Sequence, residues 1–220
     1  MERKIEDKKE LIKLVSFLTM CDGGVYQIKN RHGNLSNARF IMNHTSDDYT
    51  NYAKSILENI TTIKIYDRKD YNTDGYKRLP QKRLETQNHP YFTKIRENLY
   101  NNGYKGINSH YLKLMDAECL AMLYMADGSI GYKGEAINSV TLNTKRLTEG
   151  DNKLLSDYIF NIFGINSTIN HQNQYTYVRI KGKSIYKFYE IIRPYILNDF
   201  IYKIPNDELL LKYKQDGEIV

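Results

Sequence analysis

Apolar residues near the start of the chain recur at the spacing of one helix face, i, i+3, i+4 and i+7. These residues are Leu11, Leu14, Val15 and Leu18. The pattern predicts a helix over residues 6–21, and Asp22 and two glycines follow it as a turn. The first predicted element is therefore an apolar helix that ends on an acid.

Short runs that alternate polar and apolar residues come next, separated by segments with helical periodicity. The elements predicted for the first half are strands at 25–31 and 37–43, a helix at 46–60, strands at 62–67 and 75–79, and a helix from Pro90 to about 101. Ser46 is a suitable N-cap, and Pro90 suits a first helical turn. The polar residues 80–89 are predicted to be irregular.

The same order of elements returns from about residue 116. The elements predicted there are a helix to Asp127, strands at 129–134 and 137–143, a helix at 148–163, strands at 166–172 and 175–181, and a helix at 184–196 interrupted at Pro194. Each half has the order helix–strand–strand–helix–strand–strand–helix. This repeat indicates an internal duplication with halves at residues 1–110 and 111–220.

The duplication includes two acids and two lysines. Asp22 and Asp127 each stand before a glycine at the end of an apolar helix, 127 − 22 = 105 residues apart. Lys105 and Lys203 each follow a tyrosine, 203 − 105 = 98 residues apart. A carboxylate at a helix C-terminus is unfavourable unless a cation is close, because that end carries partial negative charge. The two matched pairs predict one site built from both halves.

Composition and charge narrow the class of protein. Lys and Arg number 32 against 26 Asp and Glu, a net charge of +6 that suits a polyanionic partner. The two cysteines, Cys21 and Cys119, and the five histidines show no metal-ligand spacing, which disfavours a histidine-metal nuclease and predicts reduced thiols. The charged N-terminus is not a signal peptide, and no apolar run reaches membrane length. We expect an intracellular protein of a cytosol-like compartment or an organelle matrix.

The helix that ends on Asp127 carries a recognisable motif. The nine residues 120–128 resemble the motif of the LAGLIDADG homing endonucleases, in the single-chain form with two motifs. The matching positions are Leu120, Ala121, Leu123, Ala126, Asp127 and Gly128. The first copy, residues 15–23, matches at Leu18, Asp22 and Gly23.

The resemblance implies an α+β fold of two pseudo-symmetric αββαββα halves. Antiparallel, saddle-shaped sheets would lie along the major groove of double-stranded DNA, and the two motif helices would pair at the interface of a monomer. The third motif residue is small in this family, whereas here it is Phe17 or Met122. Either the two helices lie further apart, or these side chains point into the core of their own half.

The resemblance also implies the chemistry of the centre. The two aspartates would hold a divalent cation, Mg²⁺, with Mn²⁺ or Ca²⁺ as substitutes, near the scissile phosphates. Backbone carbonyls at the two helix ends are plausible further oxygen ligands, and the two lysines would flank the metal and counter phosphate charge. The residues expected in this centre are Asp22, Asp127, Cys21, Ala126, Lys105 and Lys203.

Polar residues that alternate with apolar ones along the predicted strands are candidates for DNA contacts. In the first half they are Gln27, Lys29, Arg31, Asn37, Arg39, Lys64, Arg68, Tyr76 and Arg78; in the second half they are Lys133, Gln172, Tyr175, Tyr177, Arg179 and Lys181. Side chains expected on the opposite face are Tyr26, Ile28, Ala38 and Phe40, and Thr176, Val178 and Ile180. Base-specific contacts are not distinguished from phosphate contacts at this stage.

The function predicted from these features is that of a metal-dependent, site-specific endonuclease. It would hydrolyse phosphodiesters in both strands of a long DNA recognition site and so initiate the mobility of its intron or free-standing gene. The alternatives are an RNA maturase and a cleavage-deficient DNA-binding protein of the same fold. An unrelated basic, duplicated domain is a third possibility, but it leaves the paired acids and lysines unexplained.

Overall fold

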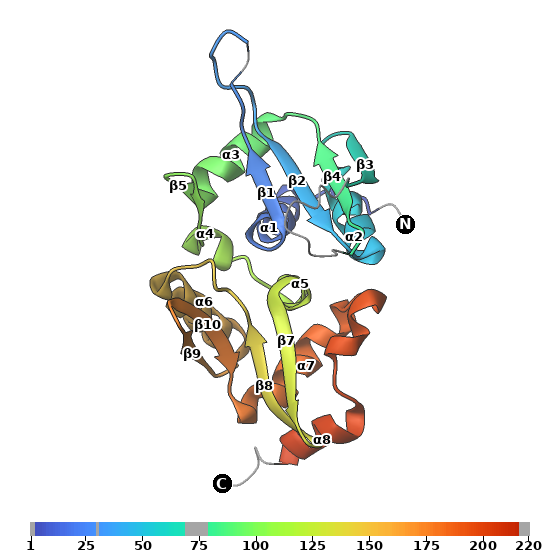
Figure 1. The fold of residues 1–220 in the computed structure, drawn as a ribbon, viewed down its shortest axis with the longest axis vertical. Coiled ribbons are helices and arrows are strands. Elements are labelled where there is room, and N and C mark those ends of the chain that lie inside the picture. The colour runs from blue at the N-terminus through green and yellow to red at the C-terminus, as the bar shows by residue number, and fades with distance from the viewer. Residues whose placement is uncertain (1–2, 30, 69–78, 216–220) are drawn as a thin grey trace. The chain divides into compact units, whose positions relative to one another are not determined.

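The computed structural model describes residues 3–29, 31–68 and 79–215 of the chain (Figure 1). The chain divides into two compact units, Met1–Tyr104 and Lys105–Val220, which we call unit 1 and unit 2. Each is described by itself. The division of the sequence repeat at residue 110 remains a prediction.

Unit 1 contains one four-stranded antiparallel sheet with the order β1-β2-β4-β3. Its elements are α1 (Lys8–Met20), β1 (Gly23–Tyr26), β2 (Arg39–His44), α2 (Asp47–Leu57), β3 (Ile63–Asp67), β4 (Lys82–Thr86), α3 (Pro90–Leu99) and β5 (Tyr100–Asn101). Helices α1, α2 and α3 pack on this sheet (Figure 1). Strand β5 pairs with β6 (Tyr104–Lys105) at the boundary of the units.

The helices of unit 1 begin where the sequence predicts, because side chains satisfy their first backbone N–H groups. The Asp7 carboxylate accepts from Lys9 N at 2.8 Å at the start of α1. Ser46 Oγ accepts from Tyr49 N at 2.9 Å at the start of α2. Pro90 occupies the first turn of α3, where a missing N–H costs no hydrogen bond.

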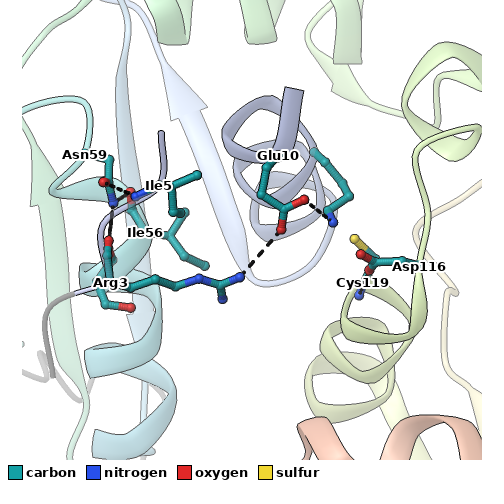
Figure 2. A network of polar contacts seen from close by, with 9 residues as sticks. Arg3, Ile5, Glu10, Ile56, Asn59, Asp116 and Cys119 are labelled. Carbon is teal, nitrogen blue, oxygen red and sulfur yellow. Dashed lines mark hydrogen bonds and ion pairs between the residues drawn. The ribbon is translucent and has the colours of Figure 1, made fainter. Parts of the chain in front are cut away.

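The segment before α1 is fastened to the end of α2 (Figure 2). Asn59 Oδ1 accepts from Ile5 N at 2.9 Å, and Asn59 Nδ2 donates to Arg3 O at 2.8 Å. The Arg3 guanidinium forms an ion pair of 3.5 Å with Glu10 of α1. One amide side chain therefore joins the approach to the first motif helix to α2.

Unit 2 repeats the sheet of unit 1 with the order β7-β8-β10-β9, also antiparallel. Its helices and strands are α4 (Ser109–Leu112), α5 (Ala117–Asp127), β7 (Gly128–Lys133), β8 (Ala136–Leu142), α6 (Glu149–Phe163), β9 (Ser167–Gln172), β10 (Tyr175–Ile180), α7 (Ile185–Ile192) and α8 (Asp207–Gln215). Its 3₁₀ turns are η1 (Gly182–Ser184), η2 (Arg193–Tyr195) and η3 (Asn198–Lys203). The two sheets thus share one strand order, as a duplication requires.

Local sequence accounts for the boundaries in unit 2. The Asp116 carboxylate accepts from Cys119 N at 3.0 Å and starts α5 (Figure 2). Thr148 forms a capping box at the start of α6, and Gly164 ends that helix in the left-handed conformation, at φ 64°. The predicted interruption at Pro194 is confirmed, because α7 ends at Ile192 and a 3₁₀ turn follows.

The prediction for the last strand of the first sheet is wrong. Strand β4 covers Lys82–Thr86, within a stretch predicted to be irregular. Of the predicted strand at 75–79, residues 75–78 lie outside the described residues and Leu79 lies in no strand. Buried Leu84 is aligned with Met42 and Ile65, while charged Arg83 and Glu85 occupy the other face. A half-buried strand whose outer positions are all charged resembles a polar loop in sequence.

The inner faces of the two sheets follow the predicted alternation except in β1. Ala38 and Phe40 are buried, as expected, and so are Thr176, Val178 and Ile180. Tyr26 and Ile28 are each 53% exposed, contrary to the prediction. For Tyr26 the reason is strand register, because Val25 is aligned with buried Phe40 and takes the inner face, whereas Tyr26 is aligned with Arg39 on the outer face. Ile28 lies beyond the end of β1, in the connection to β2. Phe17 and Met122 are fully buried.

Candidate functional site

In each unit a motif helix leads to an aspartate and a glycine and then into the first strand of a sheet. Asp22 lies in the turn between α1 and β1, and Asp127 is the last residue of α5. The glycine after each acid is required by space. A Cβ on Gly23 would overlap the Phe40 ring and Leu18 O, and a Cβ on Gly128 would overlap Tyr124. Because the glycine has no Cβ, an aromatic ring can pack against the junction of helix and strand, that of Phe40 in unit 1 and that of Tyr124 in unit 2.

A histidine that the sequence did not single out lies beside the first acid. His44 Nε2 is 3.6 Å from Asp22 Oδ2. His44 Nδ1 accepts from Ser46 N at 2.8 Å, which fixes the orientation of the ring. His44 and Asp22 meet because Gly23 of β1 is aligned with Met42 of β2. This register is long-range information, so no sequence spacing could have identified the pair.

A lysine lies at the helix end that carries the second acid. Lys203 Nζ donates to Met125 O at 2.7 Å and lies 3.5 Å from Tyr124 O, at the C-terminal end of α5. The ammonium group therefore offsets the partial negative charge of this helix end. Asp127 O accepts from Asn143 N at 2.7 Å, which ties β8 to the same end. The structure thus brings Lys203 to the helix end of Asp127, and the role of these two residues in a shared centre stays a prediction.

Two buried tyrosines, Tyr124 and Tyr189, contact the backbone carbonyl of the same lysine. The Tyr124 and Tyr189 hydroxyls are 2.7 Å apart, and Tyr124 donates to Lys203 O at 2.8 Å. Burial raises the pKa of the Tyr124 phenol, although the hydrogen bond with Tyr189 acts in the opposite direction. Burial and then the Tyr124 phenol raise the pKa of Tyr189. Both phenols are therefore neutral hydrogen-bonding groups at neutral pH.

The other residues predicted for the centre lie in different settings. Cys21 is buried and caps α1, with its N–H donating to Phe17 O at 2.9 Å. Ala126 is half-buried in the last turn of α5. Lys105 is half-buried in β6 and belongs to unit 2. The assembly of all of these residues into one centre remains a prediction.

The outer face of the first sheet carries a charged cluster in which Glu85 is central. Arg83 Nε donates to the Glu85 carboxylate, and Arg39 lies 3.7 Å from it. Burial alone raises the pKa of the Glu85 carboxyl, but hydrogen bonds from Tyr66 and Arg83 outweigh it and hold the pKa below its usual value. Lys64 of β3 is aligned with Glu85 in the ladder. Arg83 and Glu85 were missed because β4 was not predicted. Tyr66 lies in the predicted strand at 62–67, but Lys64 and Arg68, two residues to either side, were selected instead.

The outer face of the second sheet is richer in hydroxyl and amide groups. Ser129 Oγ and Thr141 Oγ1 are 2.7 Å apart, and Asn143 Nδ2 donates to Ser129 Oγ at 3.1 Å. Arg179 is aligned with Thr141 in the ladder, and its guanidinium donates to Asn138 O at 2.6 Å. The predicted alternation of Arg179 with buried neighbours is confirmed.

The remaining residues predicted to contact DNA lie mostly in loops or at strand ends. Gln27, Lys29, Arg31 and Asn37 lie in the connection between β1 and β2; Lys64 and Arg68 are exposed in and after β3; Lys133, Gln172 and Tyr175 lie at strand ends, Tyr177 lies within β10, and Lys181 follows it. Tyr76 and Arg78 lie outside the described residues. Gln27 Nε2 donates to Ser36 O at 2.7 Å, and Arg68 Nη1 donates to Gln81 Oε1 at 2.8 Å, so both side chains form hydrogen bonds near the ends of strands.

Membrane-spanning helices and metal clusters are both absent from the described part of the chain. None of its helices combines the length and apolar character that a membrane span requires. Among the same residues, no three His, Cys, Asp or Glu side chains gather as a metal cluster.

Comparisons with known proteins agree with this architecture. A chain of the homing endonuclease I-WcaI, bound to its DNA recognition sequence, superposes with a TM-score of 0.73 at 18% identity, covering 91% of this chain and 88% of that one. I-DmoI E117A, in complex with its target DNA and in the presence of Mn, gives a TM-score of 0.56 at 16% identity, covering 84% and 93%. At these identities the likeness shows the fold, and the predicted α+β class is confirmed.

Relatives at higher identity cover parts of the chain. A probable intron-encoded DNA endonuclease of Mycosarcoma maydis is 31% identical over 128 residues, 56% of this chain and 91% of that protein. An uncharacterized protein of Methanocaldococcus jannaschii is 32% identical over 119 residues, 51% of this chain, and the match spans 44% of that protein's length. The model of the LAGLIDADG DNA endonuclease family matches residues 18–188. The chain therefore belongs to the LAGLIDADG DNA endonuclease family.

Proposed function

We propose that the protein is a site-specific endonuclease that cuts both strands of a long DNA site. The observation that carries this proposal is the repeated junction of motif helix and sheet. Each of two sheets with the same strand order is entered from a motif helix through an aspartate and a glycine. Two similar halves in one chain suit the approximate twofold symmetry of a DNA duplex, so a monomer can address both strands.

The proposed centre uses oxygen ligands for a divalent cation. Asp22 and Asp127 supply carboxylates, and the backbone carbonyls of Cys21 and Ala126 lie at the same helix ends. Carboxylate and carbonyl oxygens are the donors that Mg²⁺ prefers, with Mn²⁺ or Ca²⁺ as substitutes, so these residues fit the cation. When bound, the cation supplies an activated water and neutralises charge that develops on the phosphate.

The two lysines have a separate role in the proposal. Lys105 and Lys203 counter the negative charge of the scissile phosphates in the transition state. The position of Lys203 at the end of α5 supports this role, because the same helix end carries Asp127.

The outer faces of the two sheets are the proposed DNA-binding surface, lying in the major groove. Arginine can donate two hydrogen bonds to one guanine, and amide or hydroxyl side chains can form hydrogen bonds with the edges of other bases. To the residues predicted from sequence, the structure adds Tyr66, Arg83 and Glu85 in unit 1 and Ser129 and Asn143 in unit 2. The different chemistry of the two faces leads us to expect two different half-sites.

The test of the proposed centre is Asp127→Asn. We expect cleavage to fall by on the order of a thousandfold or more, because one of two cation-binding carboxylates is removed. DNA affinity should change little, since the sheet faces are intact. Asp157→Asn is the matched control, because it makes the same charge change at an exposed position of α6 in the same unit. Full activity of Asp127→Asn would overturn the proposed centre.

A further inference from the structure

The two units pack an aromatic ring at the same place but take it from different elements. In unit 1 the ring against Gly23 is that of Phe40 in β2. In unit 2 the ring against Gly128 is that of Tyr124 in the motif helix itself. Both rings are fully buried.

The equivalent positions show a compensating exchange of size. The motif offset of 127 − 22 = 105 residues makes Thr19 the counterpart of Tyr124. The ladders align Gly23 with Met42 and Gly128 with Leu142, so Phe40, two residues before Met42, corresponds to Val140. Unit 1 has a small helix residue and a large strand residue, and unit 2 has the reverse. Total volume is conserved, as close packing demands.

In unit 2 the ring that packs against the glycine carries a hydroxyl group, that of Tyr124. Tyr124 donates to Lys203 O at 2.8 Å, and its oxygen is 2.7 Å from the Tyr189 hydroxyl, which lies 3.3 Å from Lys203 O. Each hydroxyl has one hydrogen to donate. In the arrangement that uses the two shorter distances, Tyr189 donates to Tyr124 and Tyr124 donates to Lys203 O. In unit 1, Thr19 Oγ1 donates to Val15 O of its own helix at 2.8 Å.

Lys203 is therefore held at its backbone and at its side chain by one helix. The Tyr124 phenol holds the Lys203 carbonyl, while the Tyr124 and Met125 carbonyls face its ammonium group. The ammonium also lies 5.4 Å from the centre of the Phe200 ring. The Tyr124 and Tyr189 side chains are buried and Lys203 is half-buried, so water competes poorly for the hydrogen bond between the two hydroxyls.

We propose that Tyr124 and Tyr189 are positioning residues that hold Lys203 in place for cleavage of one DNA strand. The inference rests on the proposed function, because it takes Lys203 to act at a scissile phosphate. It goes beyond that function in making the two cuts depend on different buried groups. Loss of the tyrosine hydroxyls should slow one strand selectively.

The experiment compares the two strands within one reaction. A duplex that the wild type cuts carries a different label on each strand, and nicking of each is followed with Mg²⁺ for the wild type, Tyr124→Phe, Tyr189→Phe and Lys203→Ala. Because both rates come from the same enzyme population, a loss of folded protein lowers them together and leaves their ratio unchanged. Tyr213→Phe is the matched control, since Tyr213 also donates from a tyrosine hydroxyl to a carbonyl, Ile137 O at 2.8 Å, in the same unit.

We expect Tyr124→Phe to slow the strand that Lys203→Ala slows most, by about threefold to tenfold, the effect of one lost hydrogen bond on a rate. Tyr189→Phe should slow the same strand by less, because Tyr124 keeps its own bond to Lys203 O. The other strand and the Tyr213→Phe control should stay within about twofold of the wild type, the effect expected when no bond near the centre is lost.

The possible outcomes separate the two proposals. If the wild type cuts and neither tyrosine variant changes the strand ratio, the positioning role is wrong while the endonuclease function stands. If both strands slow equally in a folded Tyr124→Phe variant, the role is also wrong. If the wild type cuts no duplex, both proposals fall. Should Tyr124→Phe fail to fold, Tyr189→Phe gives the same comparison, since Tyr124 and its ring are kept.

Discussion

The two units share a strand order but differ in the charge of the outer faces of their sheets. In unit 1 the outer face gathers Arg39 and Arg83 around Glu85. In unit 2 the corresponding face presents Ser129, Thr141 and other hydroxyl or amide groups. Register and tight glycine junctions are kept, because a change there would disturb the core of a unit. The outer face is free to diverge, so a duplicated fold can contact an asymmetric DNA site.

The largest expected effect tests whether the two acids are equivalent despite these different surroundings. Asp22→Asn should lower cleavage of both strands by on the order of a thousandfold, as Asp127→Asn does, because both carboxylates hold the cation. Strand-resolved cleavage rates measure this directly. If Asp22→Asn spared one strand completely, the two acids would act in separate centres, and the single shared centre would be wrong.

The next effect concerns the junctions that both units conserve. Gly128→Ala should lower the free energy of unfolding by about 2–3 kcal/mol, because the new Cβ overlaps Tyr124. Gly23→Ala should cost a similar amount through Phe40 and Leu18 O. Urea denaturation followed by circular dichroism gives both values. Gly182→Ala is the control, since a Cβ there meets no atom within 4 Å, and an equal loss in that variant would contradict the explanation from close packing.

A smaller effect distinguishes the two DNA faces. Arg83→Ala should weaken DNA binding by about 1–3 kcal/mol and relax base preference in one half-site, because a bidentate arginine contact is lost. Arg179→Ala should do the same in the other half-site. Selection of bound duplexes from a random library reports both changes. Arg193→Ala serves as control, since Arg193 forms an ion pair with Asp207 that joins η2 to α8. Identical sequence changes in Arg83→Ala and Arg179→Ala would show that the halves do not address separate half-sites.

The smallest effect is a pH dependence that arises from the charged cluster of unit 1. The lowered pKa of Glu85 means that its ionised form stabilises the folded state. This stabilisation is present above the ordinary value of 4.5 and is lost as the pH falls through the lowered pKa. Glu85→Gln should therefore be less stable than the wild type at neutral pH, with a difference that shrinks in acid. A difference that is constant from neutral to acidic pH, in thermal unfolding, would contradict the role of the charge.

Much of the fold could be predicted because its signals are local. Ser46, Pro90, Thr148 and Gly164 mark helix ends through hydrogen bonds or backbone angles that depend on their immediate neighbours. The matching order of elements in the two halves then indicated the duplication. Strand β4 was missed for a physical reason, since its outer positions are charged and only its ladder partners identify it as a strand.

The site was predicted only where the repeat itself carried information. Asp127 and Lys203 were found as members of matched pairs, and the structure brings Lys203 to the helix end of Asp127. His44 beside Asp22 and Arg39 beside Glu85 depend on strand register, which no local pattern contains. The hydrogen bonds of Tyr124 and Tyr189 depend on the packing of α5 against α7.

The most direct measurement of the central claim is cleavage of a randomised duplex library by the wild type with Mg²⁺, followed by sequencing of the new ends. We predict a small set of related sites with paired cuts in both strands, and no cuts when the divalent cation is chelated. Binding of discrete sites without cleavage would contradict the claim and identify a DNA-binding protein of this fold that has lost its nuclease activity.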